Sequence, residues 1–386
     1  MNDSNELLWI NTPPALESLC ARLRDVDWIA LDTEFMRERT YYPQLCLVQV
    51  ATPELVACVD PLALPQLDPL LDLLADTRIT KVLHAARQDL EIFFNLTQQV
   101  PTPVFDTQLA ASFAGFPGQI GYANLVESLL GVRLEKGHTR ADWSRRPLPE
   151  GAIHYAADDV RYLRDVYLRL QNELQQRGRL DWLQRERATL ENPSTYRTDP
   201  EQAWQRLRGL PRLKPRQRAT AKRLAAWREQ QAIAENLPRQ WVIKDELLLD
   251  IARRHPASPE ALLELRGMSE GAARKYGSAL LAALAEQQTV VETPAAPARL
   301  DPAAEALIDA LVGVVRIKSA ETGISAAQLA TRTELERLVR GERELDVLSG
   351  WRLESVGKEL LRVLNGDTTL AVRDGRLCLI NAASED

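Results

Sequence analysis

The sequence predicts a multidomain protein in which an α/β domain, a mixed sheet flanked by helices, is followed by two all-α helical-bundle domains. Residues 1–175 alternate strand-like and helix-like segments, and the strand signal disappears from about residue 180 onward. Two stretches, 191–202 and 289–302, have the polar or proline-rich composition of linkers. The expected domains are therefore 1–190, 203–288 and 303–386.

Size and composition are ordinary for a globular protein. The chain has 386 residues, of which 45% are hydrophobic and 26% charged, and this supports sizeable cores. No apolar run approaches the roughly 20 residues of a membrane span, and the N-terminal stretch lacks the regions of a signal peptide. Cys20, Cys46, Cys58 and Cys378 lie far apart without metal-ligand spacing. We therefore expect a cytoplasmic protein with reduced thiols and no membrane partner.

The α/β domain is expected to begin its sheet with three strands in succession. Apolar runs predict strands at 28–35, 45–52 and 55–60, and the last two suggest a hairpin. The following segments predict a helix at 67–75, a strand at 80–85, a helix at 86–95, and a short strand running into a helix at 103–115. The last expected element is one long amphipathic helix over about residues 150–176.

The rest of the chain carries helical patterns, except at its end. Residues 203–288 predict several helices, in which Gly267 closes one helix and Ser269 caps the next. Residues 303–366 are helical again. The tail LAVRDGRLCLI predicts a hairpin around Asp374 and Gly375, because Asp-Gly favours a tight turn between strands.

The strand WIALDTEF (28–35) carries two carboxylates where an interior strand would be apolar. An unpaired buried charge is costly, so Asp32 and Glu34 are either solvated at an exposed strand end or neutralised by a cation. Side chains two apart on a strand point to the same face, which places the two carboxylates side by side. Taken alone, this pair leaves both interpretations open.

Two further acids follow in helices. Asp89 lies in the first turn of the helix after the strand at 80–85, where an acid also complements the helix dipole. In the helix GAIHYAADDVRYLRDVYLRL, the helical phase places Tyr155 and Asp159 in a stripe beside the apolar arc. His154 and Asp158 share the same spacing but fall on the solvated side. The phase therefore favours Asp159 as the functional acid, although a surface role at the core edge remains open.

Together these acids predict a metal centre. Carboxylate oxygens suit hard divalent ions such as Mg²⁺ or Mn²⁺, and the absence of a Cys or His cluster argues against zinc. Two such ions about 3.5–4 Å apart can activate a water molecule and stabilise the leaving oxygen of a phosphodiester. The expected cofactors are two divalent ions.

The segments that carry these acids resemble those of a known family. DTEFMRERTYYPQLCLVQVA, LHAARQDLEIF, FDTQLAA and HYAADDVRYL are similar to the successive motifs of the ribonuclease D family, in the tyrosine branch of the Asp-Glu-Asp-Asp exonuclease superfamily. The segment from LPRQWV to RKYG (237–277) resembles its first HRDC (helicase-and-RNase-D C-terminal) domain. LDVLSGWRLESVGKELLRVL resembles the second HRDC domain less specifically. The resemblance implies a ribonuclease H-like fold for residues 1–190.

The resemblance also implies a mechanism. Asp32, Glu34 and Asp159 would hold the ion that activates the water, and Asp32 with Asp89 nearby would hold the ion at the departing 3′ oxygen. Tyr155 would orient the water or assist its deprotonation, although a phenol with a pKa of about 10 is a poor base at neutral pH. The family's activity implies removal of single nucleotides from an RNA with a free 3′ end, with a tRNA precursor as the expected partner. Because one chain carries the complete set of acids, we expect a monomer.

Two basic segments are candidates for RNA binding, despite a net charge of −6. Residues 134–151 place cations around Trp143 just before the third motif, although Trp143 itself fits a core anchor better. Residues 206–228 hold nine basic residues and no acidic one, a composition that suits RNA phosphates but also fits a solvated helix face. The candidate RNA-binding residues are Lys136, Arg140, Arg145, Arg146, Arg212, Lys214, Arg216, Arg218, Lys222 and Arg223.

Two other polar residues fit structural roles better. Asp106 precedes a helix and is expected to cap it, and His84 is expected to be a satisfied buried histidine. Two rival functions remain: a DNA 3′-5′ exonuclease of the same fold, and a catalytically silent RNA-binding scaffold. The first would have the same active site, because the metals act on phosphate. The second is disfavoured because clustered acids repel RNA.

Overall fold

The computed structural model describes residues 7–135, 137–138, 141–285 and 300–381. We call its three parts the α/β domain (7–190), the first helical domain (203–285) and the second helical domain (300–381). The elements of the α/β domain are β1 (Leu7–Ile10), α1 (Pro13–Leu23), β2 (Trp28–Met36), β3 (Gln44–Ala51), β4 (Val56–Val59), α2 (Asp68–Ala75), β5 (Thr80–Leu83), α3 (Arg87–Thr97), β6 (Val104–Asp106), α4 (Thr107–Phe113), α5 (Tyr122–Leu130), α6 (Glu150–Arg161), α7 (Leu163–Gln176) and α8 (Leu180–Leu190).

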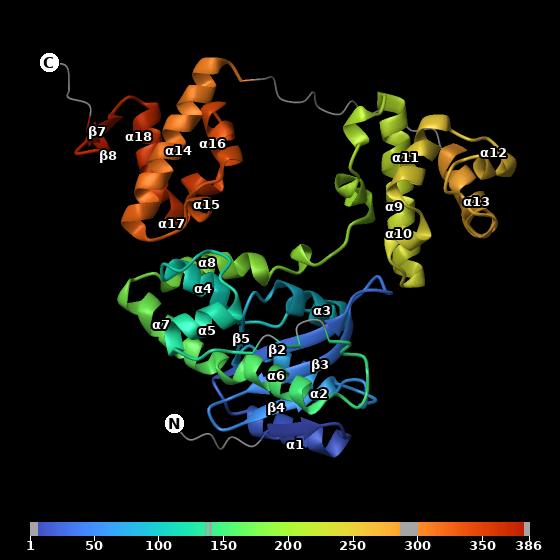
Figure 1. The fold of residues 1–386 in the computed structure, drawn as a ribbon, viewed down its shortest axis with the longest axis horizontal. Helices are drawn as coiled ribbons and strands as arrows, with labels where there is room; N and C mark the ends of the chain where they lie inside the picture. The colour runs from blue at the N-terminus through green and yellow to red at the C-terminus, as the bar shows by residue number, and fades with distance from the viewer. Residues whose placement is uncertain (1–6, 136, 139–140, 286–299, 382–386) are drawn as a thin grey trace.

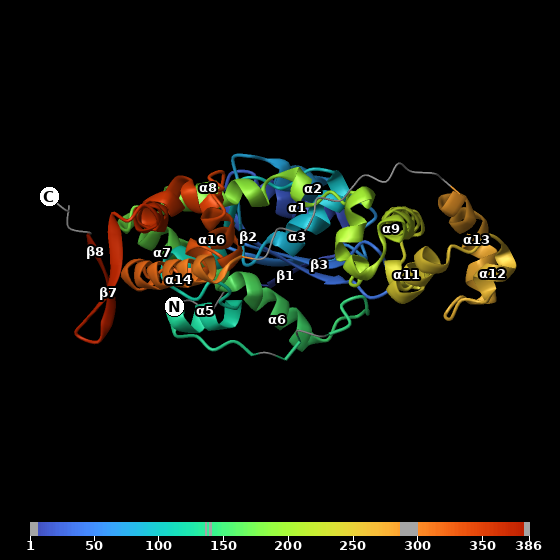
Figure 2. The same cartoon turned by 90° about the horizontal axis from the view of Figure 1, so that it is seen from above.

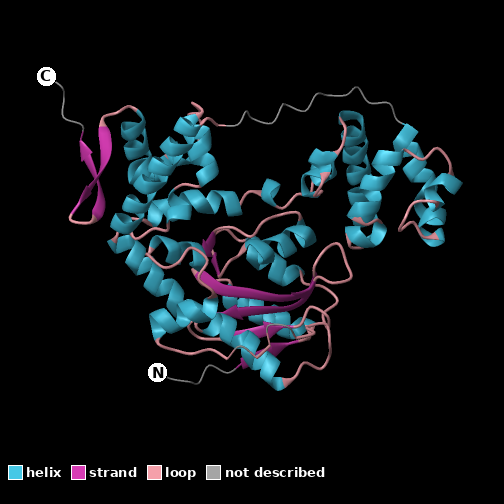
Figure 3. Ribbon diagram, turned by 45° about the horizontal axis from the view of Figure 1, so that its top comes forward, coloured by secondary structure: helices cyan, strands magenta, loops and turns pink. Residues whose placement is uncertain are grey.

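The sheet is mixed, with strand order β1-β4-β3-β2-β5-β6 (Figure 3). β2 pairs antiparallel with β3 and parallel with β5, and β3 and β4 form the expected hairpin. On β2, Ile29 and Leu31 face a core shared with α1, α2 and α3, whereas Ala30 faces a core shared with α4 to α7. The sheet is therefore covered by helices on both faces, as Figure 2 also shows.

The strands and helices expected in the α/β domain are confirmed, with ends shifted by a few residues, except for the last helix. Residues 150–176 form two helices, α6 and α7, separated at Tyr162. α6 packs on β2, β3 and β4, whereas α7 packs on α4 and α5. The chain bends at Tyr162 because its two halves cover different partners. The prediction of one continuous helix was therefore wrong.

The predicted linker 191–202 is partly anchored. It contains the 3₁₀ turn η1 (Pro193–Thr195) and enters η2 (Pro200–Arg206). Tyr196 is buried in the core around α3, where its ring contacts Phe94, and its hydroxyl donates to the carbonyl of Leu190 at 2.7 Å. Residues 286–299, most of the second predicted linker, lie outside the described residues.

The first helical domain has a hydrophobic core of its own. Gly267, with a φ of 97°, ends the segment before α13, and Ser269 Oγ accepts from the N–H of Ala272 at 3.1 Å, as the sequence predicts. Its elements are η3 (Leu210–Arg212), α9 (Pro215–Glu235), α10 (Arg239–Val242), α11 (Asp245–Arg254), α12 (Pro259–Leu263) and α13 (Glu270–Ala285).

The second helical domain is built around one long helix. Its elements are α14 (Pro302–Thr322), α15 (Ala326–Leu329), α16 (Arg332–Val339), η4 (Asp346–Leu348), α17 (Gly350–Arg352), the π-helical segment η5 (Leu353–Gly357), α18 (Lys358–Leu364), β7 (Thr368–Arg373) and β8 (Arg376–Asn381). β7 and β8 confirm the predicted hairpin, with Asp374 and Gly375 both at positive φ in the turn.

The second helical domain shares a continuous hydrophobic core with the α/β domain. Trp351 stacks on Trp182 of α8 with ring centroids 5.2 Å apart and meets the edge of Phe113 of α4 at 5.1 Å. Arg179 ties the two parts by donating to the carbonyls of Phe113 and Thr322. In Figures 1 and 2 the two helical domains lie at opposite ends of the molecule.

Two further observations concern the cysteines and the helices. Cys20, Cys46, Cys58 and Cys378 are all free thiols, and the first three are buried. Within the described ranges, no helix is both long and apolar enough to span a bilayer.

Candidate active site

The predicted acids gather at the edge of the sheet where β2 and β5 end. Asp32 and Glu34 lie in the second half of β2, and β5 runs parallel to it. The chain turns after β5 into α3, whose first turn carries Asp89. α6 crosses the sheet above β2, β3 and β4 and brings Asp159 to the same edge. Parallel strands end at the same edge, which is where α/β sheets build their sites.

Asp32, Glu34 and Asp159 form one cluster. A carboxylate oxygen from each lies within 4.8 Å of the others, and all three side chains are half-buried. The two strand acids therefore share a face, and the acid of α6 that joins them is Asp159, the one that the helical phase favours. Asp158, by contrast, pairs with Arg161 at 2.5 Å on the outer side of the helix.

Asp89 is not one of the carboxylates that lie within 4.8 Å of one another, but it is held next to β2 by Thr33. It is 7% exposed, and its Oδ1 accepts a hydrogen bond from the hydroxyl of Thr33 at 2.5 Å. Its charge nevertheless acts on Asp32, whose pKa it helps to raise. The Thr33 contact could not be predicted from the sequence, because it joins two segments that only the fold brings together.

The site holds more negative charge than its surroundings neutralise. Burial, reinforced by the neighbouring carboxylates, raises the pKa of Asp32 well above its usual range and that of Glu34 to about 8. Burial likewise raises the pKa of Asp89 and of Asp159 to about 7. Within the described part of the chain, the charges that act on Asp32 and Glu34 are carboxylates. Such a donor set fits a bound divalent cation, which would supply the missing positive charge.

Tyr155 lies one turn before Asp159 on α6, and its hydroxyl donates a hydrogen bond to the Asp159 carboxylate. Burial, followed by the charges of Asp159, Glu34 and Asp32, raises the pKa of Tyr155 above its usual value. The phenol therefore stays protonated at neutral pH. It acts as a hydrogen-bond donor at this site and is a poor base.

A cavity of ≈ 350 Å³ opens beside Tyr155 and Asp159. Tyr122 and Asn124 of α5 line its other wall, together with His138. Tyr122 holds α5 against α6 by donating to the carbonyl of Asp158 at 2.9 Å. The sequence reasoning missed this wall, because nothing in the pattern around Tyr122 indicates which helix it will face.

Asp106 and His84 have the structural roles that the sequence predicts. Asp106 Oδ1 caps α4 by accepting from the N–H groups of Gln108 and Leu109, and its two oxygens also accept from Ala85 and Ala86 just before α3. His84 is bracketed by the hydroxyl of Thr107 and the carbonyl of Ile120, both at 3.0 Å. These bonds fix the start of α3 and hence the position of Asp89.

The loop before α6 contains both a core anchor and a surface. Trp143 is 2% exposed and belongs to the core, as predicted. The guanidinium of Arg146 is engaged in an ion pair with Asp60 at 2.7 Å and also donates to the carbonyl of Cys46. It therefore holds the loop on the sheet, and a role of Arg146 in RNA binding stays a prediction. Arg145 is exposed, whereas Lys136 and Arg140 lie outside the described residues.

The second basic segment is only partly free for RNA. The side chains of Arg212, Lys214 and Arg216 are exposed at the start of α9. Farther along α9, Lys222 lies over the ring of Trp204 at 3.9 Å from its centroid, and Arg218 donates to the carbonyl of Leu213. Arg223 is half-buried as well. The exposed half of the predicted patch is thus at the N-terminal end of α9.

Comparison with protein-family models agrees with both parts of this description. Residues 7–175 match the model described as 3'-5' exonuclease, and residues 217–284 match the HRDC domain. The fold and the acid cluster thus define a protein of the 3′-5′ exonuclease class.

Curated relatives extend the match over almost the whole chain. Ribonuclease D of Granulibacter bethesdensis is 44% identical over 375 residues, covering 95% of this chain and 94% of its own. Ribonuclease D of Acidiphilium cryptum is 43% identical, with 97% of each chain covered. Among solved structures, Escherichia coli RNase D, described as an exoribonuclease involved in structured RNA processing, matches with a TM-score of 0.80 and 36% identity, covering 94% of this chain and 99% of that one. The chain belongs to the ribonuclease D family.

Proposed function

We propose that this protein is a metal-dependent 3′→5′ exoribonuclease that releases nucleoside 5′-monophosphates and trims the 3′ ends of tRNA precursors and other structured RNAs. The observation that carries the proposal is the convergence of Asp32, Glu34 and Asp159 within 4.8 Å, where no cation of the described residues is among the charges that raise the pKa values of Asp32 and Glu34. A carboxylate cluster that only supported RNA binding would repel the phosphates. This argues against the silent-scaffold alternative.

Each residue of the site has an assigned part. Asp32, Glu34 and Asp159 would hold one divalent ion, and Asp32 with Asp89 would hold a second. When bound, Mg²⁺ or Mn²⁺ lowers the pKa of water and stabilises charge on the phosphate oxygens. Tyr155 keeps its proton and orients the attacking water or the phosphate by donating a hydrogen bond. The adjoining cavity of ≈ 350 Å³ has room for the terminal nucleoside.

The test is hydrolysis of an end-labelled structured RNA with and without Mg²⁺, with a DNA strand of the same sequence alongside. We expect Mg²⁺-dependent release of mononucleotides from the RNA. Asp32→Asn should abolish release, by about 10³-fold or more, while RNA binding and the circular-dichroism spectrum are kept. Tyr155→Phe should lower kcat by about 10²-fold.

The matched control is Asp165→Asn, which removes a carboxylate from the outer side of α7, where it lies 3.7 Å from Arg164. This variant should trim RNA as the wild type does. Unchanged trimming by Asp32→Asn would refute the site. Faster degradation of the DNA strand would favour the DNA exonuclease instead.

We further propose that the enzyme works as a monomer in a reducing compartment, the cytoplasm. All the acids of the cluster come from one chain, and the four cysteines are unpaired thiols. Sedimentation equilibrium at micromolar concentration should give a mass near 43.4 kDa. A stable dimer whose dissociation abolishes activity would contradict the monomer.

A further inference from the structure

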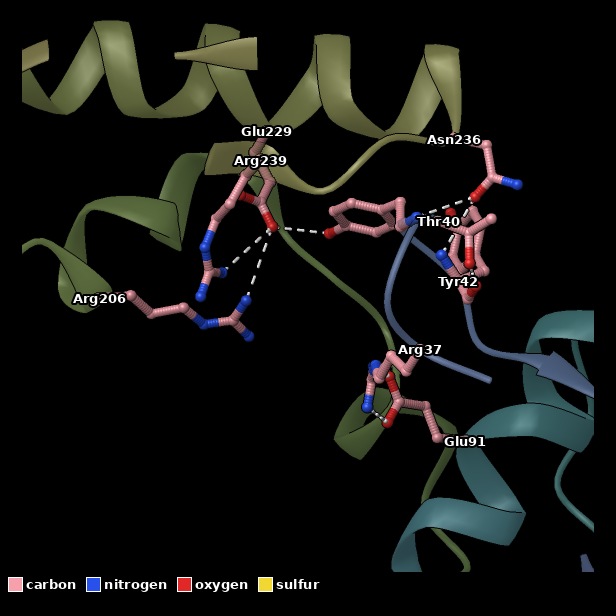
Figure 4. Close-up of polar contacts among 9 residues, drawn as sticks. Arg37, Thr40, Tyr42, Glu91, Arg206, Glu229, Asn236 and Arg239 are labelled. Atoms are coloured by element: carbon pink, nitrogen blue, oxygen red, sulfur yellow. Dashed lines mark hydrogen bonds and ion pairs between the residues drawn. The ribbon is translucent and has the colours of Figure 1, made fainter. Parts of the chain in front are cut away.

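The α/β domain meets the first helical domain at the turn that directly follows β2. The hydroxyl of Tyr41 donates to Glu229 Oε1 of α9 at 2.6 Å, and the main-chain N–H groups of Tyr41 and Tyr42 both donate to Asn236 Oδ1 at 3.1 Å. Asn236 ends α9 in the left-handed conformation. Figure 4 shows Asn236 above the turn and Glu229 on the neighbouring part of α9. The strand that carries Asp32 and Glu34 is thus tied to the first helical domain.

A cavity of ≈ 400 Å³, here called the junction cavity, lies between these two domains. Side chains of both domains line it, among them Arg37, Tyr41, Tyr42, Glu91, Arg206 and Arg239. Arg206 ends η2, and Arg239 begins α10. The cavity therefore exists only while the first helical domain is docked on the α/β domain.

We propose that the junction cavity is a subsite for a backbone phosphate of the RNA strand, upstream of the bond that is cut, with Arg206 and Arg239 as its phosphate-binding residues. The proposal rests on the exoribonuclease function proposed above. It adds a second contact with the RNA strand. Arg206 begins the basic segment 206–228, but neither Arg206 nor Arg239 is among the RNA-binding residues predicted from the sequence.

The two arginines have unused hydrogen-bonding capacity. Arg206 and Arg239 approach Glu229 Oε1 at 3.6 Å and 4.0 Å, distances too long for hydrogen bonds. Their side chains are 59% and 37% exposed. Figure 4 shows both guanidinium groups turned toward Glu229 from the same side. Guanidinium groups held in this way can donate in pairs to the oxygens of a phosphate.

Glu229 keeps the arginines in place. Its side chain is 1% exposed, and its second oxygen, Oε2, has no hydrogen-bond partner within the described part of the chain. A buried carboxylate that is only partly satisfied attracts cations strongly, because its charge is poorly screened. Glu229 therefore holds Arg206 and Arg239 beside the cavity in the absence of RNA.

Selection for phosphate comes from hydrogen bonding rather than from net charge. The lining contains three arginines but also Glu38, Glu91 and Glu229. Arg37 and Glu91 satisfy each other through two N–H···O bonds, and Glu229 is engaged by Tyr41. Arg206 and Arg239 make no hydrogen bond to Glu229 at their distances, whereas Arg37 already uses two of its N–H donors on Glu91. Tyr42, 37% exposed, adds an aromatic face on which a base can stack.

The junction cavity is also close to the acids along the chain. Arg37 is three residues beyond Glu34, and Glu91 is two residues beyond Asp89 on α3. At about 3.3 Å per strand residue and 1.5 Å per helix residue, these separations are within the reach of one or two nucleotides. A strand whose 3′ end lies at the acids can therefore place an upstream phosphate in the cavity.

The experiment compares two substrates: a dinucleotide and a single-stranded oligoribonucleotide of about 20 nucleotides. For the double variant Arg206→Gln and Arg239→Gln we expect a five- to tenfold higher KM on the long RNA and an unchanged kcat. Cleavage of a dinucleotide without a 5′ phosphate should not change, because it has no phosphate upstream of the bond that is cut. The salt dependence of log KM on the long RNA should lose a slope of about 1–2.

The control double variant is Arg78→Gln and Arg332→Gln. It removes the same charge from exposed ion pairs, one just before β5 and one on α16. Equal changes in the control, or equal changes on both substrates, would overturn the proposal. If circular dichroism shows that the double variant is misfolded, the single variant Arg206→Gln replaces it, because this side chain is 59% exposed. The single variant must then raise KM on the long RNA, by less than the double variant would, and leave cleavage of the dinucleotide unchanged. If the wild-type enzyme hydrolyses neither substrate, the proposed function itself fails.

Discussion

Asp158 and Asp159 are adjacent on α6, yet their surroundings differ. Asp158 faces outward and pairs with Arg161, whereas Asp159 faces Asp32 and Glu34. A helix turns by about 100° per residue, so hydrophobic periodicity alone separates the two. That is why the sequence could select the clustered acid. It could not indicate the hydrogen bond from Thr33 to Asp89, since no local pattern records a contact across 56 positions.

The raised pKa values predict how stability depends on pH. In the folded protein the pKa values are about 8 for Glu34 and about 7 for Asp89 and Asp159, whereas unfolded carboxyl groups titrate near 4. Between about pH 4 and pH 8 the folded protein binds more protons than the unfolded chain. This contribution to the free energy of unfolding is therefore largest at low pH and decreases as pH rises through that window.

Urea unfolding in EDTA at about pH 5.5 and pH 8 measures this effect. We expect Asp32→Asn to stabilise the metal-free protein at pH 8, by on the order of 1–3 kcal/mol, because it removes one repelling charge. Mg²⁺ should stabilise the wild type more at pH 8 than at pH 5.5, since it competes with protons. If the free energy of unfolding in EDTA depends on pH equally in the wild type and in Asp32→Asn, the carboxylates do not repel one another as inferred here.

At the scale of elements, a single side chain organises two helices. Asp106 accepts hydrogen bonds from four N–H groups, two at the start of α4 and two just before α3. Since α3 carries Asp89, the cap also positions part of the active site. Asp106→Ala should lower the free energy of unfolding by about 2–3 kcal/mol, because it leaves these N–H groups without their partner.

Asp301→Ala is the matched control for this prediction. Asp301 caps α14 with one hydrogen bond to the N–H of Ala304 at 2.7 Å. Its loss should cost about 1 kcal/mol or less. Equal losses in the two variants, measured by urea unfolding, would show that the bonds to the start of α3 contribute nothing.

Most helices and strands could be predicted from the sequence, but the residues at which they begin and end depend on tertiary contacts. The strands of the sheet centre follow from apolar runs, because they are buried on both faces. β1 and α5 were not predicted, and length is not the reason, since β4 and β5 are as short as β1 and α2 is shorter than α5. The bend at Tyr162 reflects the separate partners of α6 and α7, which periodicity does not contain.

At the scale of the whole molecule, the second helical domain is part of the α/β core. Trp351 is 4% exposed, and its indole N–H donates to Glu186 at 3.0 Å. Trp351→Ala should lower the free energy of unfolding by about 3–5 kcal/mol. In calorimetry, we expect the second helical domain and the α/β domain to unfold in one transition in the wild type and in two separate transitions in this variant. Trp241→Ala, at a 59% exposed position, should change stability by less than about 0.5 kcal/mol.

This shared core could not be predicted from the sequence. The sequence predicts only that residues 303–366 are helical, and the structure shows that α14 buries Ile308, Leu311, Val314 and Val315. Periodicity shows that an apolar side of a helix needs a partner, but it does not show which one. The sequence therefore predicted the existence of the second helical domain and left its union with α4 and α8 to the structure.

The contact between Trp182 and Trp351 has a consequence for biosynthesis. The ribosome makes Trp351 about 170 residues after Trp182, and at 5–20 residues per second this takes roughly 10 to 30 seconds. During that interval the nascent α/β domain exposes the apolar surface of α4 and α8 to solvent. Each nascent chain is therefore incompletely folded and prone to aggregation during this interval. The exposure ends only when the helices of the second helical domain have been made and can pack on α4 and α8.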